Sequence, residues 1–202
     1  MFTLADKYSL TPDPDLCWLS ANCGYNSDSL SWRLHLQTQD AMVQFSSVTE
    51  RVAFAISVTP PLGVTNWREL CEQRVELSEV PLRCGFMFRC GISSQWEDLV
   101  SLDLRFGQTR EMQIEIFAEG WGCVEAEPEI FPGGEVEFRI QSWVNFRGVG
   151  INVPLNVVNP LAYSETRIKT LLPDYAFSTP QILKTSDERG VIRAVEVLFG
   201  PK

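Results

Sequence analysis

The chain has 202 residues, of which 45% are hydrophobic and 21% are charged, as in folded proteins that bury a sizeable core. Its formal net charge of −9 at pH 7 disfavours nucleic acid and anionic membranes as partners. The longest apolar runs have the length of strands, and residues 1–7 lack a basic segment followed by an apolar one. We therefore expect a cytoplasmic protein with neither a membrane span nor a secretory signal.

Strand patterns dominate the chain. Residues 30–37, 100–107, 112–116 and 136–141 alternate between apolar and polar side chains, which is typical of antiparallel sheets with one buried and one wetted face. The fold class is therefore predicted to be mainly β, an antiparallel sandwich or a barrel-like meander. In chain order, strands are predicted over 16–23, 30–37, 42–47, 51–58, 82–90, 100–107, 112–116, 121–127, 136–141, 145–153, 176–184 and 190–199.

One segment has the pattern of a helix, and we expect one short helix over 66–76. Asn66 can cap its N-terminus, with Glu69 three residues later as in a capping box, and apolar residues then recur at helical spacing. Proline-containing segments flank it, so 60–80 is the best candidate for an internal connector. Further Pro- or Gly-containing breaks lie at 131–134 and 156–160.

A phrase of the sequence occurs twice. Residues 17–24 (CWLSANCG) are echoed by 84–91 (CGFMFRCG), and the similarity continues downstream if 95–97 is treated as an insertion. The echo indicates an internal duplication or two similar hairpins in one sheet, and both predict strand, loop, strand in each copy. As a duplication, a single β-rich domain over 1–202 would have repeat halves 14–63 and 81–134, with 135–202 as a C-terminal extension of the sheet.

The six cysteines are expected to be free thiols, most of them in the core. Cys17 and Cys23 are six residues apart, about 20 Å in a strand, whereas disulfide partners need Cα atoms within about 7 Å. A disulfide between the two copies is the alternative. No Cys-x-x-Cys occurs and the chain has one histidine, so we expect no zinc site, and no cofactor motif is present.

The negative charge is concentrated in one stretch. Eight glutamates and no Lys, Arg or Asp lie between residues 111 and 138. If 121–129 is extended, Glu125, Glu127 and Glu129 share one face. Glu135 and Glu137 follow a Pro-Gly-Gly turn, and we expect them to lie beside that stripe on a neighbouring strand.

These five glutamates are our candidate partner-binding residues. A concentrated acidic patch attracts cationic partners and repels nucleic acid, so it favours a basic protein as the partner. The alternatives are a solvated face, a charged edge that prevents edge-to-edge strand pairing, a calcium site, and a hydrolase with paired carboxylates.

Two tryptophans lie beside acidic residues and are candidates for ligand binding. Trp96 belongs to the insertion, next to Glu97 and Asp98, and Trp121 lies between two glycines. A tryptophan in such a loop can stack on a sugar or anchor a partner, and the alternative is a lid on the core.

No catalytic motif is present. There is no phosphate-binding loop and no Gly-x-Ser-x-Gly, and a nucleophilic triad would have to use His35, the single histidine. We therefore predict a non-catalytic binding protein that presents an acidic, strand-built surface to a basic macromolecular partner. The alternatives are a carbohydrate or small-ligand binding module and a hydrolase that uses paired glutamates.

Overall fold

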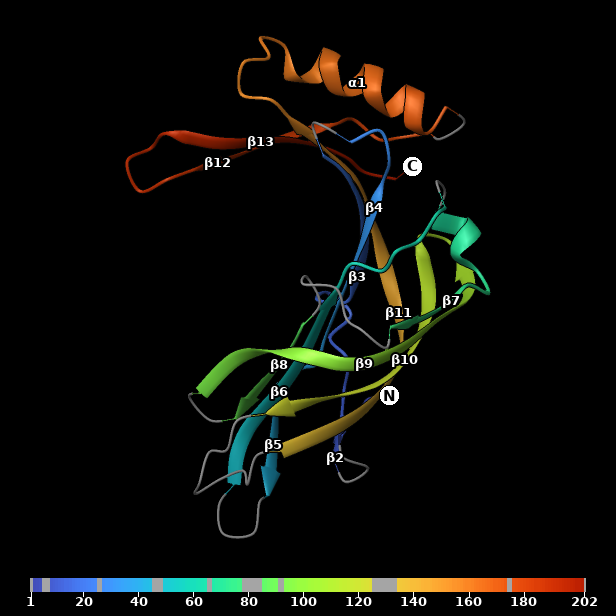
Figure 1. Ribbon diagram of the computed structural model, residues 1–202, viewed down its shortest axis with the longest axis vertical. Helices are drawn as coiled ribbons and strands as arrows, with labels where there is room; N and C mark the ends of the chain where they lie inside the picture. The colour runs from blue at the N-terminus through green and yellow to red at the C-terminus, as the bar shows by residue number, and fades with distance from the viewer. Residues whose placement is uncertain are drawn as a thin grey trace.

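The computed structural model describes residues 2–4, 8–24, 27–44, 49–64, 67–77, 85–90, 93–124, 134–173 and 176–201. These residues form thirteen strands, one 3-10 helix and one α-helix (Figure 1), so the prediction of a mainly β fold is confirmed. Neither helix is long and apolar enough to cross a bilayer within this part of the chain. The strands are β1 (Phe2–Leu4), β2 (Tyr8–Leu10), β3 (Trp18–Cys23), β4 (Ser31–Gln37), β5 (Ala41–Gln44), β6 (Thr49–Val58), β7 (Arg74–Leu77), β8 (Gly85–Cys90), β9 (Ser93–Arg110), β10 (Gln113–Val124), β11 (Gly134–Val153), β12 (Gln181–Ser186) and β13 (Ile192–Phe199).

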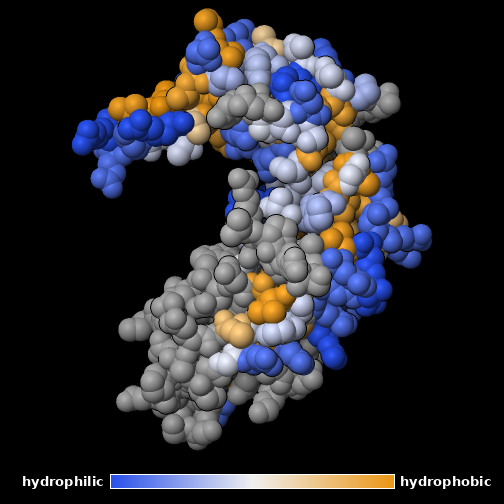
Figure 2. Space-filling view, viewed as in Figure 1, coloured by the Kyte–Doolittle hydropathy of each residue, from blue (hydrophilic) through white to orange (hydrophobic). Residues whose placement is uncertain are grey.

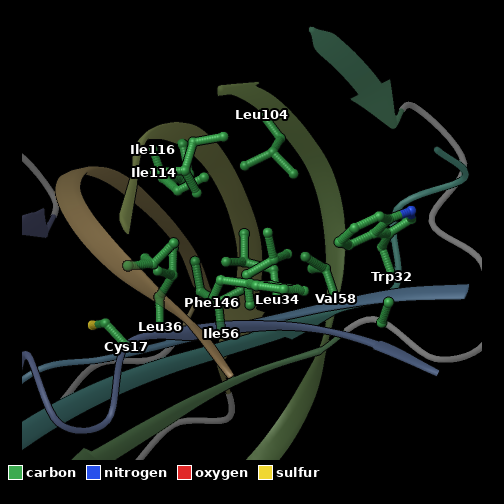
Figure 3. Packing of buried hydrophobic residues seen from close by; sticks show 14 of the residues in the cluster. Cys17, Trp32, Leu34, Leu36, Ile56, Val58, Leu104, Ile114, Ile116 and Phe146 are labelled. Carbon is green, nitrogen blue, oxygen red and sulfur yellow. The ribbon is translucent and has the colours of Figure 1, made fainter. Parts of the chain in front are cut away.

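All thirteen strands belong to one sheet, whose main path runs β10-β9-β8-β6-β4-β3-β11-β1-β2. The sheet is mixed rather than purely antiparallel, because β3 and β11 pair in parallel while the other pairs are antiparallel. It is not closed into a barrel. It bends so that two layers face each other, and Figure 3 shows buried side chains of β9 and β10 above those of β4 and β6.

The core follows the alternation expected from the sequence. Leu34 and Leu36 of β4 and Ile56 of β6 lie in one layer and are at most 2% exposed. Leu104 of β9 and Ile114 of β10, both fully buried, lie in the other layer (Figure 3). The polar residues between them face outward, so the outer face of the sheet is where charged side chains gather.

A bulge corrects one detail of the predicted alternation. Trp121 pairs with Ser101 and Gly122 pairs with Leu99, so Val100 is an extra residue on β9. As a result Leu99 is buried and Val100 is exposed, although the sequence pattern placed Val100 on the apolar face. From Leu102 onward the predicted phase holds.

The helix predicted over 66–76 is a single 3-10 turn, η1 (Trp67–Leu70), followed by strand β7. Trp67 and Leu70 are fully buried, so the apolar spacing was correct, but Glu72 has a positive φ of 66° and the chain turns there instead of continuing as a helix.

The α-helix, α1 (Pro160–Leu171), was not predicted. Asn159 caps it by accepting a hydrogen bond from the backbone N–H of Ala162 at 3.1 Å, and Pro160 is its first residue. From the sequence alone, this Asn-Pro pair indicates a break between elements. Only Ser164 and Ile168 of the helix are buried, so its sequence carries little of the apolar periodicity that marks a helix.

Both copies of the repeated phrase form a hairpin, but the hairpins differ in register. Trp18 of β3 pairs with His35 of β4. The equivalent residues of the second copy are Gly85 and Arg105, yet Gly85 of β8 pairs with Asp98 of β9. The duplication and its boundaries therefore stay a prediction.

The four cysteines whose side chains the structure describes are free thiols, but Cys71 is only partly buried and Cys123 is exposed, so the expected burial holds for two of them. Cys17 and Cys23 are buried free thiols, and burial raises the pKa of Cys17 above its ordinary value. Cys84 and the side chain of Cys90 lie outside the described residues.

Strand β11 changes partners along its length. Its N-terminal part pairs with β10 as far as Asn145, and its C-terminal part pairs with β3 and β13. A register shift between Phe146 and Gly148 separates the two parts, and Gly148 has a φ of 112°. A Cβ at Gly148 would overlap the backbone carbonyl oxygen of Phe199 in β13. Glycine is therefore required here for both its backbone conformation and its small size.

Replacing Gly148 by alanine should lower the free energy of unfolding by more than about 2 kcal/mol, because positive φ and overlap with a neighbouring strand act together. Gly134→Ala is the matched control: Gly134 has a φ of 102° with no atom within 4 Å of an added Cβ. There we expect about 1 kcal/mol. Urea denaturation of both variants measures the difference, and equal losses would contradict the steric part of the explanation.

Candidate functional site

The predicted site residues fall into three groups. Glu125, Glu127 and Glu129 lie outside the described residues. Trp96, Glu97 and Asp98 belong to β9, where they pair with Met87, Phe86 and Gly85 of β8, and only their backbone is described. They are therefore in a hairpin strand and not in a loop, which corrects the sequence analysis.

Trp121, Glu135 and Glu137 are brought together by the pairing of β10 with β11. Trp121 pairs with Glu137, and Cys123 pairs with Glu135. The two glutamates thus lie on the strand next to residues 121–124, whereas the predicted stripe of glutamates beside which we expect them lies outside the described residues. Trp121 itself is inside β10 and not between strands. Their role in binding stays a prediction.

Residues that pair across a sheet share a face, so the registers place further charges beside Trp121. Glu76, Asp103, Glu119 and Arg139 form one row across β7, β9, β10 and β11. Ser101, Trp121 and Glu137 form the next row. These two rows line an open cavity of about 410 Å³ on the outer face, which we call the acidic pocket.

On the core side of the sheet, beneath the pocket, neighbouring strands pack closely around Gly120. A Cβ at this position would overlap the backbone carbonyl oxygen of Ser101 and would lie 2.7 Å from Cζ of Phe138. Because Gly120 has no side chain, β9 and the Phe138 ring pack tightly under the pocket, and the neighbouring Trp121 is held on a rigid base.

The carboxylates of the pocket differ in how they are compensated. Asp103 accepts hydrogen bonds from Nε and Nη2 of Arg74, both at 2.9 Å, and from Nη2 of Arg105 at 2.6 Å. These bonds hold the pKa of Asp103 well below its ordinary value, at about 2, so it is ionised at neutral pH. Arg74 also forms an ion pair with Glu76, with 2.7 Å between Nη2 and Oε1.

Among the described residues, Glu119 and Glu137 form no close ion pair like that of Asp103, but Glu119 lies opposite Arg139 and interacts electrostatically with Arg74 and Arg105. Both are exposed at the outer face, on adjacent strands and one row apart. Glu137 and the partly compensated Glu119 are therefore less firmly held than Asp103, and both lie next to Trp121.

A second cavity adjoins the first. It has a volume of about 420 Å³ and shares Asp103 and Glu119 with the acidic pocket. Phe117 and Arg105 are among its other lining residues. The two cavities together follow the outer face of β9 and β10, so an extended ligand could contact both.

The geometry limits the chemistry. A glycosidase needs one protonated carboxyl beside an ionised one, and Asp103, with a pKa of about 2, cannot be that acid at neutral pH. Among the described residues, no group of three or more His, Cys, Asp or Glu side chains is placed to hold a metal ion.

Sequence reasoning missed Glu76, Asp103 and Arg74. The alternation of 100–107 does place Asp103 on the polar face, but which strands flank it depends on the pairing of β7 and β10 with β9. Glu119 was within the glutamate stretch, although only its pairing partners show that it faces the same cavity as Glu137.

Replacing Asp103 by asparagine removes the charge that both arginines contact, and should lower the unfolding free energy at pH 7 by about 1 kcal/mol because the pairs are partly screened by solvent. The pKa of Asp103 is lower in the folded state than its ordinary value of 3.8. Its contribution is thus complete above that value and is lost as the pH falls through about 2. Denaturation of both proteins from pH 7 down to pH 2 measures it, and a difference that does not shrink would contradict the assignment.

No protein-family model, curated protein or solved structure matches this chain. What the acidic pocket binds must therefore be argued from its own charges and shape.

Proposed function

We propose that the chain is a non-catalytic binding protein whose acidic pocket receives a cationic side chain of a basic protein partner. The observation that supports this most directly is the position of Glu119 and Glu137, two exposed carboxylates that no arginine holds by hydrogen bonds as Asp103 is held, beside Trp121 on one face. Like charges on adjacent strands destabilise a sheet, and a cation bound between them removes that cost.

An arginine fits this pocket better than a lysine. A guanidinium stacks on the face of a tryptophan ring and donates paired hydrogen bonds to carboxylates, whereas an ammonium is a compact and strongly hydrated charge. Trp121 offers the ring and Glu119 and Glu137 offer the acceptors, from adjacent strands of the same sheet. Of the described lining residues, four are acidic and only Arg139 is basic.

The rest of the molecule favours the approach of a basic partner. The net charge of −9 steers cationic proteins toward it at low ionic strength. The second cavity, which shares Glu119 with the pocket, offers room for the residues next to the arginine. The glutamates at 125, 127 and 129 keep their predicted role in this proposal, as further acidic contacts.

The test uses a peptide with four Gly-Arg repeats and a matched peptide in which neutral citrulline replaces each arginine. We expect tryptophan fluorescence to report binding of the arginine peptide only, weakening as salt is raised. The double variant Glu119→Gln with Glu137→Gln should lower the affinity at least tenfold, because charge-assisted hydrogen bonds to each carboxylate are lost.

The control variant is the pair Glu165→Gln and Glu188→Gln, which makes the same charge change on exposed residues of α1 and of the turn after β12. It should bind the arginine peptide like the wild-type protein. Equal loss in both double variants would show attraction to net charge alone and would contradict the pocket, as would equal binding of the citrulline peptide.

A carbohydrate-binding module is the second candidate, and Trp121 is the observation that favours it. A partly exposed ring can stack on a sugar while the carboxylates beside it accept hydrogen bonds from the sugar hydroxyls. A titration with a panel of neutral oligosaccharides should then quench the fluorescence of the wild-type protein but not that of Trp121→Leu. No response to any glycan, together with arginine-dependent binding, would decide for the first function.

A further inference from the structure

The hairpin of β12 and β13 is an arm that projects from the rest of the molecule (Figure 1). All six residues of β12 are exposed, and so are the first three of β13. The C-terminal half of β13 pairs with residues 149–153 of β11, which fixes the base of the arm to the sheet. Its outer part has solvent on both faces.

The arm carries aliphatic side chains that the described residues do not cover. Ile182, Leu183, Val191 and Ile192 are each between 40% and 49% exposed. Ile182 pairs with Val197, so it continues the face on which that valine is buried. Figure 2 shows this apolar surface along the arm. Clustered exposed aliphatic residues of this kind mark contact surfaces more often than isolated ones do.

The arm also has an open edge. Within the described part of the chain, β12 pairs with β13 alone, so the backbone N–H and C=O groups on its other side are available to another strand. The sequence of β12 contains no proline, and Lys184 is its only charged residue. Such an edge accepts a further strand readily unless charges oppose it.

We propose that the partner of this edge is a second copy of the chain, with the two β12 strands antiparallel across a two-fold axis. The charges of the molecule favour this contact at the arm. The chain as a whole has a net charge of −9, but residues 181–199 are balanced, with Lys184, Arg189 and Arg193 against Asp187, Glu188 and Glu196. The arm is therefore a place where two copies can meet without strong repulsion.

One register between the two β12 strands avoids a contact between like charges and joins the apolar faces of the two arms. A two-fold axis at Leu183 places Leu183 opposite its own copy and Ile182 opposite Lys184 of the other strand. A shift of the axis by one residue to Lys184 would place two lysines opposite each other, which is unfavourable. In the first register both arms keep their apolar face on the same side, so Ile182 and Ile192 of the two copies form one surface.

The interface expected from this contact is small. A stable dimer usually buries about 800 Å² on each partner, and one six-residue edge with four aliphatic side chains offers less. The dimer should therefore be weak, with a dissociation constant of about 10 to 100 µM. This contact is distant in the sequence from the acidic pocket, and the two proposals can fail separately.

Sedimentation velocity from about 1 to 300 µM tests the association, a range that brackets the expected constant. The wild-type mass should rise from 22.9 kDa toward twice that value. Leu183→Lys places lysines opposite each other and should weaken the dimer at least tenfold. Met42→Lys, at an aliphatic residue of β5 that is 65% exposed, is the matched control and should dimerise like the wild type.

A cysteine pair tests the register. In a Cys123→Ser background, which removes a native thiol that is exposed, Leu183→Cys should form a covalent dimer under diamide oxidation that the background variant alone does not form. Thr185→Cys, which lies opposite Gln181 in the proposed register, should form it much more slowly. A monomeric wild type at the highest concentration, an unaffected Leu183→Lys variant, or equal cross-linking at both positions would overturn the proposal.

Discussion

The change of partners along β11 is the constraint on which the rest of this structure depends. One strand of twenty residues belongs to both layers, and it can do so because the backbone turns at Gly148, where no side chain fits against β13. The two surfaces for which we propose a binding role are attached to its two ends. Glu137 and Arg139 of the acidic pocket lie on the N-terminal part, and the arm is anchored on residues 149–153. The relative placement of pocket and arm is therefore set by a single bulge.

The acidic pocket contains one carboxylate that two arginines fix in place and others that are not fixed in this way. Asp103 is locked by two arginines, so it contributes to the stability of the sheet and is poorly suited to bind a ligand. Glu119 and Glu137 lie on the same face and form no such hydrogen bonds among the described residues, although Arg74 and Arg105 also attract Glu119. Asp103 thus stabilises the wall of the pocket, whereas in our proposal Glu119 and Glu137 bind the cation. This difference also explains why a count of glutamates in the sequence is a poor guide to the site, because the neighbours of each carboxylate decide its role.

Much of the fold could be predicted because a strand with one buried and one solvent-exposed face alternates between apolar and polar residues. The pattern of 30–37 identified the buried face of β4 correctly, and that of 136–141 did so for β11. The helix α1 could not be found this way, since it buries only Ser164 and Ile168. The pocket was found in part: Trp121 and Glu137 were both candidate site residues, but their pairing across β10 and β11 is known only from the structure. Glu76 and Asp103 could be assigned to the pocket only from the pairing of strands that are distant in the sequence. No local sequence pattern encodes that pairing.

The parallel pairing of β3 with β11 has a consequence for how the chain assembles during synthesis. Residues 18–23 lie next to residues 145–151 in the finished sheet, so the hairpin of β3 and β4 must wait until most of the chain has been made before its neighbour exists. Contacts between such distant segments slow folding, because the entropy of closing the long loop is lost before the contact stabilises it. Until then β3 has an open edge, and the hairpin of β3 and β4 is exposed to mispairing during synthesis.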